Sequence, residues 1–347
     1  MGAMPSRFPR PLLPVAAFIL FLCMDIAPAP AGDAGITLDT AGADAWIACM
    51  EAGKTAPDSC EAGSASTLGG QLAELAIPTF GSLPAERPAD PPVERVAALR
   101  TAIRGWDIGA LAADIAGLFP PQEPFPIRIF LVGNGVPVWG DMYVRTYAFD
   151  GGKPRLDDAG EPIILINARL NAAYPGSAES LAKDTRDVVR HELFHVVFSR
   201  FRSRDPGWRR LDAPDRDSQL LLMVEDEGIA HFLAMQDQWR QNGFPEKRAT
   251  AALSALTAAV EAISAGTATE ETLQKANEGP FWEKYGAISG ALFAYGIDKT
   301  AGEEGLRRSL IEGPASFILR YDAATAADPA LPPLPDRLRR WANAHPH

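Results

Sequence analysis

The sequence predicts an α+β fold in which a small mixed β-sheet is followed by a mainly helical C-terminal region. Three runs of β-branched or aromatic residues lie near one another, at 127–132, 142–148 and 163–167, separated by Gly, Asp and Pro clusters. From Ser177 to the end, apolar residues instead recur at helical spacing. Strands and helices that are segregated along the chain favour an α+β fold over alternating βαβ units.

The composition is that of a globular protein. The chain has 347 residues, of which 47% are hydrophobic and 22% charged, so it can build a sizeable core. Its 33 basic and 44 acidic residues give a formal net charge of -11, which argues against a nucleic-acid binder because such proteins need clustered Lys and Arg. We therefore expect a peptide, a protein or a small molecule as partner, and the oligomeric state stays open.

The N-terminus has the three-part pattern of a secretory signal peptide, which we assign to residues 1–31. Arg7 and Arg10 precede an apolar stretch at 12–23, and small residues follow it. That stretch is shorter than the roughly 20 residues that a membrane-spanning helix needs. We predict cleavage near Ala31 and export to the periplasm or out of the cell, without a stable transmembrane anchor. An uncleaved anchor is the alternative.

The region 32–120 is predicted to be mostly helical, with helices at 93–103 and 108–118. Once the signal peptide is removed, Cys49 and Cys60 are the only cysteines left. An even pair in an exported chain is most simply a disulfide, so we predict a Cys49–Cys60 bridge. Two unpaired buried thiols are the alternative.

Two further regions complete the chain. Residues 121–205 contain the three predicted strands, a turn at Asp150–Gly152 and a helix at 187–201. Residues 206–347 are predicted to form a helical region with prolines between its helices. The sequence contains no internal repeat and no long low-complexity segment.

The helix at 187–201 carries an H-E-x-x-H motif made of His191, Glu192 and His195. Histidines at i and i+4 share one helical face and can bind the same Zn²⁺ at about 2.0 to 2.1 Å. Glu192 lies about 100° further round the helix, where it can act as a general base without being a ligand. Most of the helix is apolar, so polar groups in its middle need a function. Two satisfied core histidines are the structural alternative.

A catalytic zinc needs a third protein ligand and an open fourth position. The metzincin pattern is excluded, since Phe198 and Phe201 stand where that pattern has Gly and His. H-E-L-F-H is instead followed, 32 residues on, by E-G-I-A-H-F in a second apolar helix at 221–239. This combination resembles the gluzincin metallopeptidases, in particular the peptidase MA-like families. The resemblance implies Glu227 as third ligand and one Zn²⁺ per chain, and Gly228 permits a close approach of the two helices.

The resemblance implies further features of the site. It makes the H-E-x-x-H helix a zincin active-site helix. It also suggests Tyr285, on a later helix, as a catalytic residue whose hydroxyl stabilises an oxyanion, with ordinary packing as the alternative. The strand at 163–167 fits an edge strand that binds a peptide or protein substrate through its backbone, with an interior position as the alternative.

Four residues near the two motifs are each assigned a role. Asp187, one turn before the first histidine, either fixes a ligand tautomer or is a solvated carboxylate. Glu225 is the main competitor of Glu227 for the metal, and Asp226 is interpreted as a surface charge. His231, one turn after Glu227, either assists substrate binding or packs as a satisfied histidine.

We interpret the chain as an exported zinc-dependent metallopeptidase that hydrolyses peptide bonds with Glu192 as general base. One alternative is a zinc-bearing module that binds a peptide or an envelope partner without turnover. Another is a zinc hydrolase of a non-peptide amide. The presence of Glu192 disfavours the binding module, because such a module has no need of a base beside the metal.

Overall fold

The structure is a computed structural model. It describes residues 35–53, 57–77, 90–120, 125–134, 142–204, 206–209, 211 and 215–346. The predicted signal peptide, 1–31, lies outside these residues. Among the helices in these ranges, none is both long enough and apolar enough to cross a membrane.

The chain builds a five-stranded sheet. Its strands are β1 (Ile36–Asp39), β2 (Ile127–Val132), β3 (Met142–Asp150), β4 (Lys153–Leu156) and β5 (Glu161–Asn167). Their order in the sheet is β1-β2-β5-β3-β4. β1, β2 and β5 are parallel, whereas β3 is antiparallel to β5 and to β4. The predicted small mixed sheet, and with it the α+β fold class, is confirmed.

The sequence does not predict β1 or β4, which form the two edges of the sheet. Each has four residues, too few for an alternating pattern to be recognised. β4 also contains Pro154, which a strand tolerates at a sheet edge. The turn predicted at Asp150–Gly152 is confirmed as the β3–β4 connection. Gly151 and Gly152 have φ values of 58° and 83°, the left-handed conformation that a tight hairpin turn requires.

β5 is an interior strand. The strand predicted at 163–167 is therefore not an edge strand that binds substrate, and the alternative of an interior position is confirmed. Ile163 pairs with Arg128 of β2 on one side and with Arg145 of β3 on the other. The side chains from Ile163 to Ile166 are completely buried. The backbone groups of β5 are therefore used within the sheet and cannot receive a peptide.

Helices cover the sheet. On one face, α3 (Leu68–Ala76) packs against the strands, and Tyr147 of β3 donates a hydrogen bond to the Leu72 carbonyl at 2.8 Å. The opposite face, which includes Ile129 and Ile164, belongs to the main core. The other helices of this half are α1 (Ala41–Glu51), α2 (Pro57–Ala65), α4 (Val93–Arg104), α5 (Ile108–Ala116) and α6 (Ala168–Ala173).

A disulfide joins α1 to α2, as predicted. Cys49 and Cys60 are bonded across a sequence separation of 11, and Cys60 is completely buried. Closing a loop of this size removes conformational entropy from the unfolded chain and contributes about 2 to 3 kcal/mol. The bridge thus stabilises a helical segment that has few long helices of its own.

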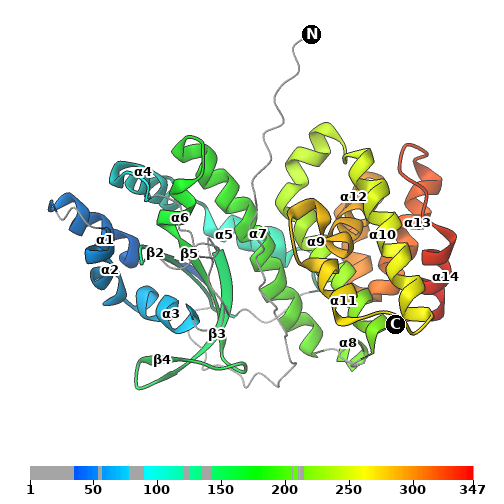
Figure 1. Cartoon of the computed structure of the whole chain (residues 1–347), viewed down its shortest axis with the longest axis horizontal. Coiled ribbons are helices and arrows are strands. Elements are labelled where there is room, and N and C mark those ends of the chain that lie inside the picture. The colour runs from blue at the N-terminus through cyan, green and yellow to red at the C-terminus, as the bar shows by residue number, and fades with distance from the viewer. Residues whose placement is uncertain are drawn as a thin grey trace, which may run out of the picture.

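The rest of the chain is helical. Its helices are α7 (Ala178–Arg204), α8 (Pro206–Arg209), α9 (Arg216–Asn242), α10 (Glu246–Ser264), α11 (Glu270–Asn277), α12 (Tyr285–Glu312), α13 (Pro314–Ala327) and α14 (Asp336–Ala344), with a short 3-10 helix η3 (Phe281–Glu283) before α12. Figure 1 shows α7 in the middle of the molecule, between the sheet with its helices and the group formed by α9 to α14. Because α7 packs against α4, α5 and α9, it connects the two halves.

α9 and α12 cross at very close range. A Cβ atom added to Gly228 would lie 2.4 Å from the Gly290 Cα, and one added to Gly290 would lie 1.8 Å from the Val224 carbonyl oxygen. Real Cβ atoms do not come that close to backbone, so both positions require glycine. The sequence predicts Gly228 at a helix crossing with the motif helix, but the partner in the structure is α12.

We expect Gly290→Ala to lower the free energy of unfolding by about 2 kcal/mol or more, because the added methyl group meets the backbone of α9. The matched control is Gly109→Ala in α5. Gly109 is exposed and helical, and the nearest atom to a Cβ there is 3.5 Å away, so this change should be neutral or stabilise by up to about 1 kcal/mol. Urea unfolding of both variants measures the difference, and equal midpoints would contradict the packing argument.

Candidate metal centre

Two helices bring the three predicted metal ligands together. His191 and His195 project from α7, and Glu227 projects from α9. The two Nε2 atoms are 3.0 Å apart, and each lies 3.7 Å from Glu227 Oε2. Ligand atoms at zinc distances in a tetrahedral site are about 3.3 to 3.4 Å from one another. The spacing of the three donor atoms therefore fits a single zinc ion.

Both histidine rings have hydrogen-bond partners on α9. His195 Nδ1 donates to Asp226 Oδ1 at 2.7 Å, and the backbone of Ala230 forms a hydrogen bond with the His191 ring. Partners of this kind fix the tautomer of a ligand histidine and leave the other nitrogen for the metal. The interpretation of Asp226 as a surface charge is therefore wrong. Its partner lies on another helix, 31 positions earlier in the sequence, so helix spacing alone could not identify it.

The other two acidic candidates lie apart from the three donors. Asp187 forms an ion pair with Lys183 at 2.7 Å, so its carboxylate pairs with a lysine of the same helix and not with a histidine of the centre. Glu225 is completely buried, and neither of its carboxylate oxygens has a hydrogen-bond partner among the described residues. Burial raises the pKa of Glu225 well above its ordinary value. Its oxygens do not belong to the group of three donor atoms, which disfavours Glu225 as a competitor.

His231 lies against the three donors. Its ring centroid is 4.8 Å from that of His191, and its Nδ1 donates to the Glu227 carbonyl at 2.8 Å. The centroid of the Phe281 ring lies 5.3 Å from the centroid of the His231 ring. The sequence places His231 on the face of Glu227, and the structure agrees. Its backbone hydrogen bond fixes the ring orientation beside the centre.

The electrostatics of the centre favour a cation. Burial by itself would lower the pKa of His195, but Asp226 and Glu227 raise it to about 10. Burial lowers the pKa of His191 well below its ordinary value and raises that of Glu227. The carboxylates around His195 thus favour a positive charge in a buried place, which a divalent metal ion would supply.

Glu192 directly follows His191 but is not one of the three donors. It is partly buried, and it interacts electrostatically with His195 and with Lys284, the residue directly before α12. Sequence reasoning missed Lys284, because a lysine before a helix carries no signal of its own. It selected the neighbour, Tyr285, whose hydroxyl donates to the Thr272 carbonyl at 2.6 Å. The catalytic role of Tyr285 stays a prediction, and its hydroxyl would have to leave Thr272 to perform it.

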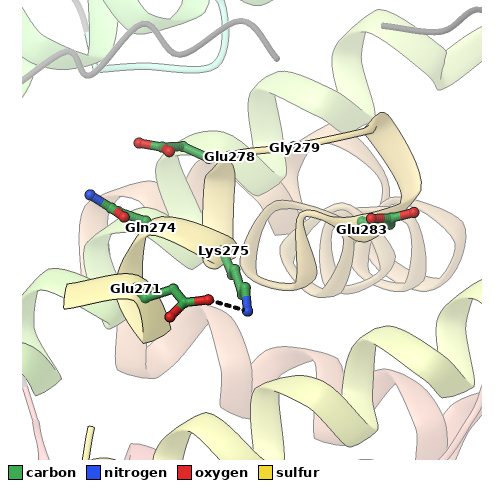
Figure 2. Close-up of a pocket in the computed structure, with 6 residues that line it drawn as sticks. All are labelled: Glu271, Gln274, Lys275, Glu278, Gly279 and Glu283. Carbon is green, nitrogen blue, oxygen red and sulfur yellow. Dashed lines mark ion pairs between the residues drawn. The ribbon is translucent and has the colours of Figure 1, made fainter. Parts of the chain in front are cut away.

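A surface hollow of about 380 Å³ lies between α11 and η3 (Figure 2). Its lining contains none of the three donors and not Glu192. Figure 2 shows Lys275 turned toward Glu271, with which it forms an ion pair at 2.6 Å. Glu283 also lines the hollow, whereas the next residue, Lys284, does not.

Two histidines one turn apart, a glutamate from a second helix and a glutamate beside the first histidine are typical of a zinc-dependent peptidase. A family model described as "Putative zinc dependent peptidase (DUF5700)" matches residues 118–330, more than half of the chain. The chain belongs to this family of zinc-dependent peptidases. The matched segment includes β2 to β5, α6 to α13 and all three donors. No curated protein and no solved structure matches the chain.

We expect Asp226→Ala to weaken zinc binding by about 10- to 100-fold, because His195 loses the carboxylate that fixes its tautomer and raises its basicity. Asp187→Ala is the control, since Asp187 pairs with Lys183 and not with a histidine. Competition with a chromophoric chelator measures both affinities. If both variants bind zinc as tightly as the wild type does, the hydrogen bond to Asp226 has no role in holding the metal.

Proposed function

We propose that this chain is an exported metallopeptidase of the gluzincin type that hydrolyses peptide bonds. His191, His195 and Glu227 would hold one Zn²⁺ per chain, and Glu192 would be the general base. The spacing of the three donor atoms, 3.0, 3.7 and 3.7 Å, is the observation that carries the proposal. The match to a zinc-dependent peptidase family supports the same class of reaction.

In the proposed reaction, Glu192 transfers a proton from the attacking water to the leaving amine. When bound, zinc supplies a lowered pKa for the attacking water and a polarised scissile carbonyl. The Glu192 carboxylate accepts a proton from the attacking water and later gives it to the nitrogen of the leaving amine. Glu192 directly follows His191 on α7 and interacts electrostatically with His195, which places it near the centre without making it one of the three donors.

Export is the second part of the proposal. The Cys49–Cys60 disulfide supports it, because disulfides persist in oxidising compartments such as the periplasm or the extracellular space. The signal-peptide pattern of residues 1–31 supports it independently. Cleavage near Ala31 would leave a mature chain that begins just before β1.

The test is incubation of the mature protein with a diverse peptide pool, with and without a chelator. We expect cleavage that the chelator abolishes and that added zinc restores, together with about one zinc per chain by metal analysis. Full zinc occupancy without cleavage would favour a binding module instead. Cleavage of non-peptide amides alone would favour a zinc hydrolase of such amides.

A further inference from the structure

Lys284 lies in a segment that is fixed against the metal centre from both sides. Before it, η3 places the Phe281 ring 5.3 Å from the ring of His231. After it, α12 packs on α9 at the Gly228–Gly290 crossing. Since α9 carries Glu227, the backbone at Lys284 is positioned by contacts with the helix that provides the third ligand.

The charge of Lys284 interacts with several residues of this centre, including His191 and His231. The ammonium interacts electrostatically with Glu227 and Glu192, and also with Glu278. Within the described ranges, the Lys284 ammonium forms no hydrogen bond and no ion pair within 4.0 Å. By contrast, Lys275, nine positions before Lys284, is exposed and forms an ion pair with Glu271 at 2.6 Å. A partly buried ammonium has three N–H donors, so Lys284 has donors available for a group that enters the site.

In amide hydrolysis, a hydrogen-bond donor of this kind can stabilise the carbonyl oxygen as it becomes negatively charged. As the water oxygen adds to the carbonyl carbon, the electron pair of the C=O bond moves to the carbonyl oxygen, and a donor near that oxygen lowers the barrier. Tyr285 would be an alternative donor, but its hydroxyl is bound to the Thr272 carbonyl at 2.6 Å. The ammonium of the neighbouring Lys284 forms no such hydrogen bond among the described residues.

We propose that Lys284 is a catalytic residue, whose ammonium donates a hydrogen bond to the carbonyl oxygen of the scissile bond as negative charge develops there. This inference rests on the proposed peptidase function. The group it recognises is a tetrahedral, negatively charged carbon or phosphorus centre, not the ground-state peptide.

The experiment compares Lys284→Met with Lys284→Arg and with the control Lys275→Met. For Lys284→Met we expect unchanged zinc content, a kcat that is lower by about 10²- to 10³-fold and a KM within a few-fold of the wild type. Its affinity for a phosphinic peptide, measured by calorimetry on the zinc-loaded protein, should fall by a similar factor. Lys284→Arg keeps the charge and should restore part of both losses, while Lys275→Met should match the wild type.

Several outcomes would overturn this role. A kcat of Lys284→Met within a few-fold of the wild type would exclude it, as would a loss confined to KM, which would indicate binding of a substrate carboxylate. Loss of zinc from both Lys284→Met and Lys284→Arg would indicate a structural role instead. These results differ from failure of the peptidase function itself, in which the zinc-loaded wild type cleaves no peptide and the proposal for Lys284 falls with it.

Discussion

Glu192→Gln should keep about one zinc per chain while hydrolysis of a cleaved peptide falls by about 10²- to 10⁴-fold or more. The amide has the shape of the carboxylate but cannot accept a proton from water, and Glu192 is not one of the three donors. Metal analysis and the rate of peptide cleavage, measured on the same sample, separate the two roles. Retained metal without turnover is the expected result.

The matched control is Glu179→Gln, an exposed position in the first turn of the same helix. It makes the same chemical change without approaching the centre, so zinc content and rate should both equal those of the wild type. If Glu192→Gln cleaves peptides as fast as Glu179→Gln, Glu192 is not the base. If it loses zinc instead, Glu192 contributes to holding the metal.

Glu227→Ala should weaken zinc binding by more than the roughly 10- to 100-fold expected for loss of a hydrogen-bonding partner such as Asp226. The substitution removes the oxygen that lies 3.7 Å from both Nε2 atoms and leaves a site of two histidines. Zinc affinity by chelator competition is the measurement. Activity should disappear with the metal and return only partly at high zinc concentration.

Two controls distinguish Glu227 from its neighbours on α9. Glu225→Gln changes a completely buried side chain that is not one of the three donors, so zinc affinity should stay unchanged. Asp237→Ala removes an exposed carboxylate from the same helix and should also have no effect. A Glu227→Ala protein that holds zinc as tightly as the wild type, combined with loss of zinc in Glu225→Gln, would assign the third ligand to Glu225.

The local parts of the fold were accessible from sequence. The strands β2, β3 and β5 appear as apolar or alternating runs, and the β3–β4 turn is marked by Gly151 and Gly152. The side chains of His191 and His195 share a face because of the helical repeat alone. Edge strands β1 and β4 are too short to show a pattern, so they could not be predicted.

By itself, the sequence determined the α+β class, the Cys49–Cys60 pair, and two histidines on one helical face with an adjacent glutamate, Glu192. It also selected Glu227 through a resemblance to known metallopeptidases, and the structure places that residue with the histidines. These features depend on spacing within one helix or on short motifs. Such features follow from backbone geometry, which the sequence specifies directly.

Only the tertiary structure decided which side chains surround His191 and His195. β5 is interior because β2 and β3 both pair with it, and pairing between distant segments leaves no mark in the strand itself. Asp226 meets His195 because of the way α9 crosses α7. Consecutive residues on a helix point about 100° apart, so the docking angle of each helix selects which one faces the centre. For the same reason, Tyr285 turns to Thr272 while its neighbour Lys284 is left to interact with Glu192 and Glu227.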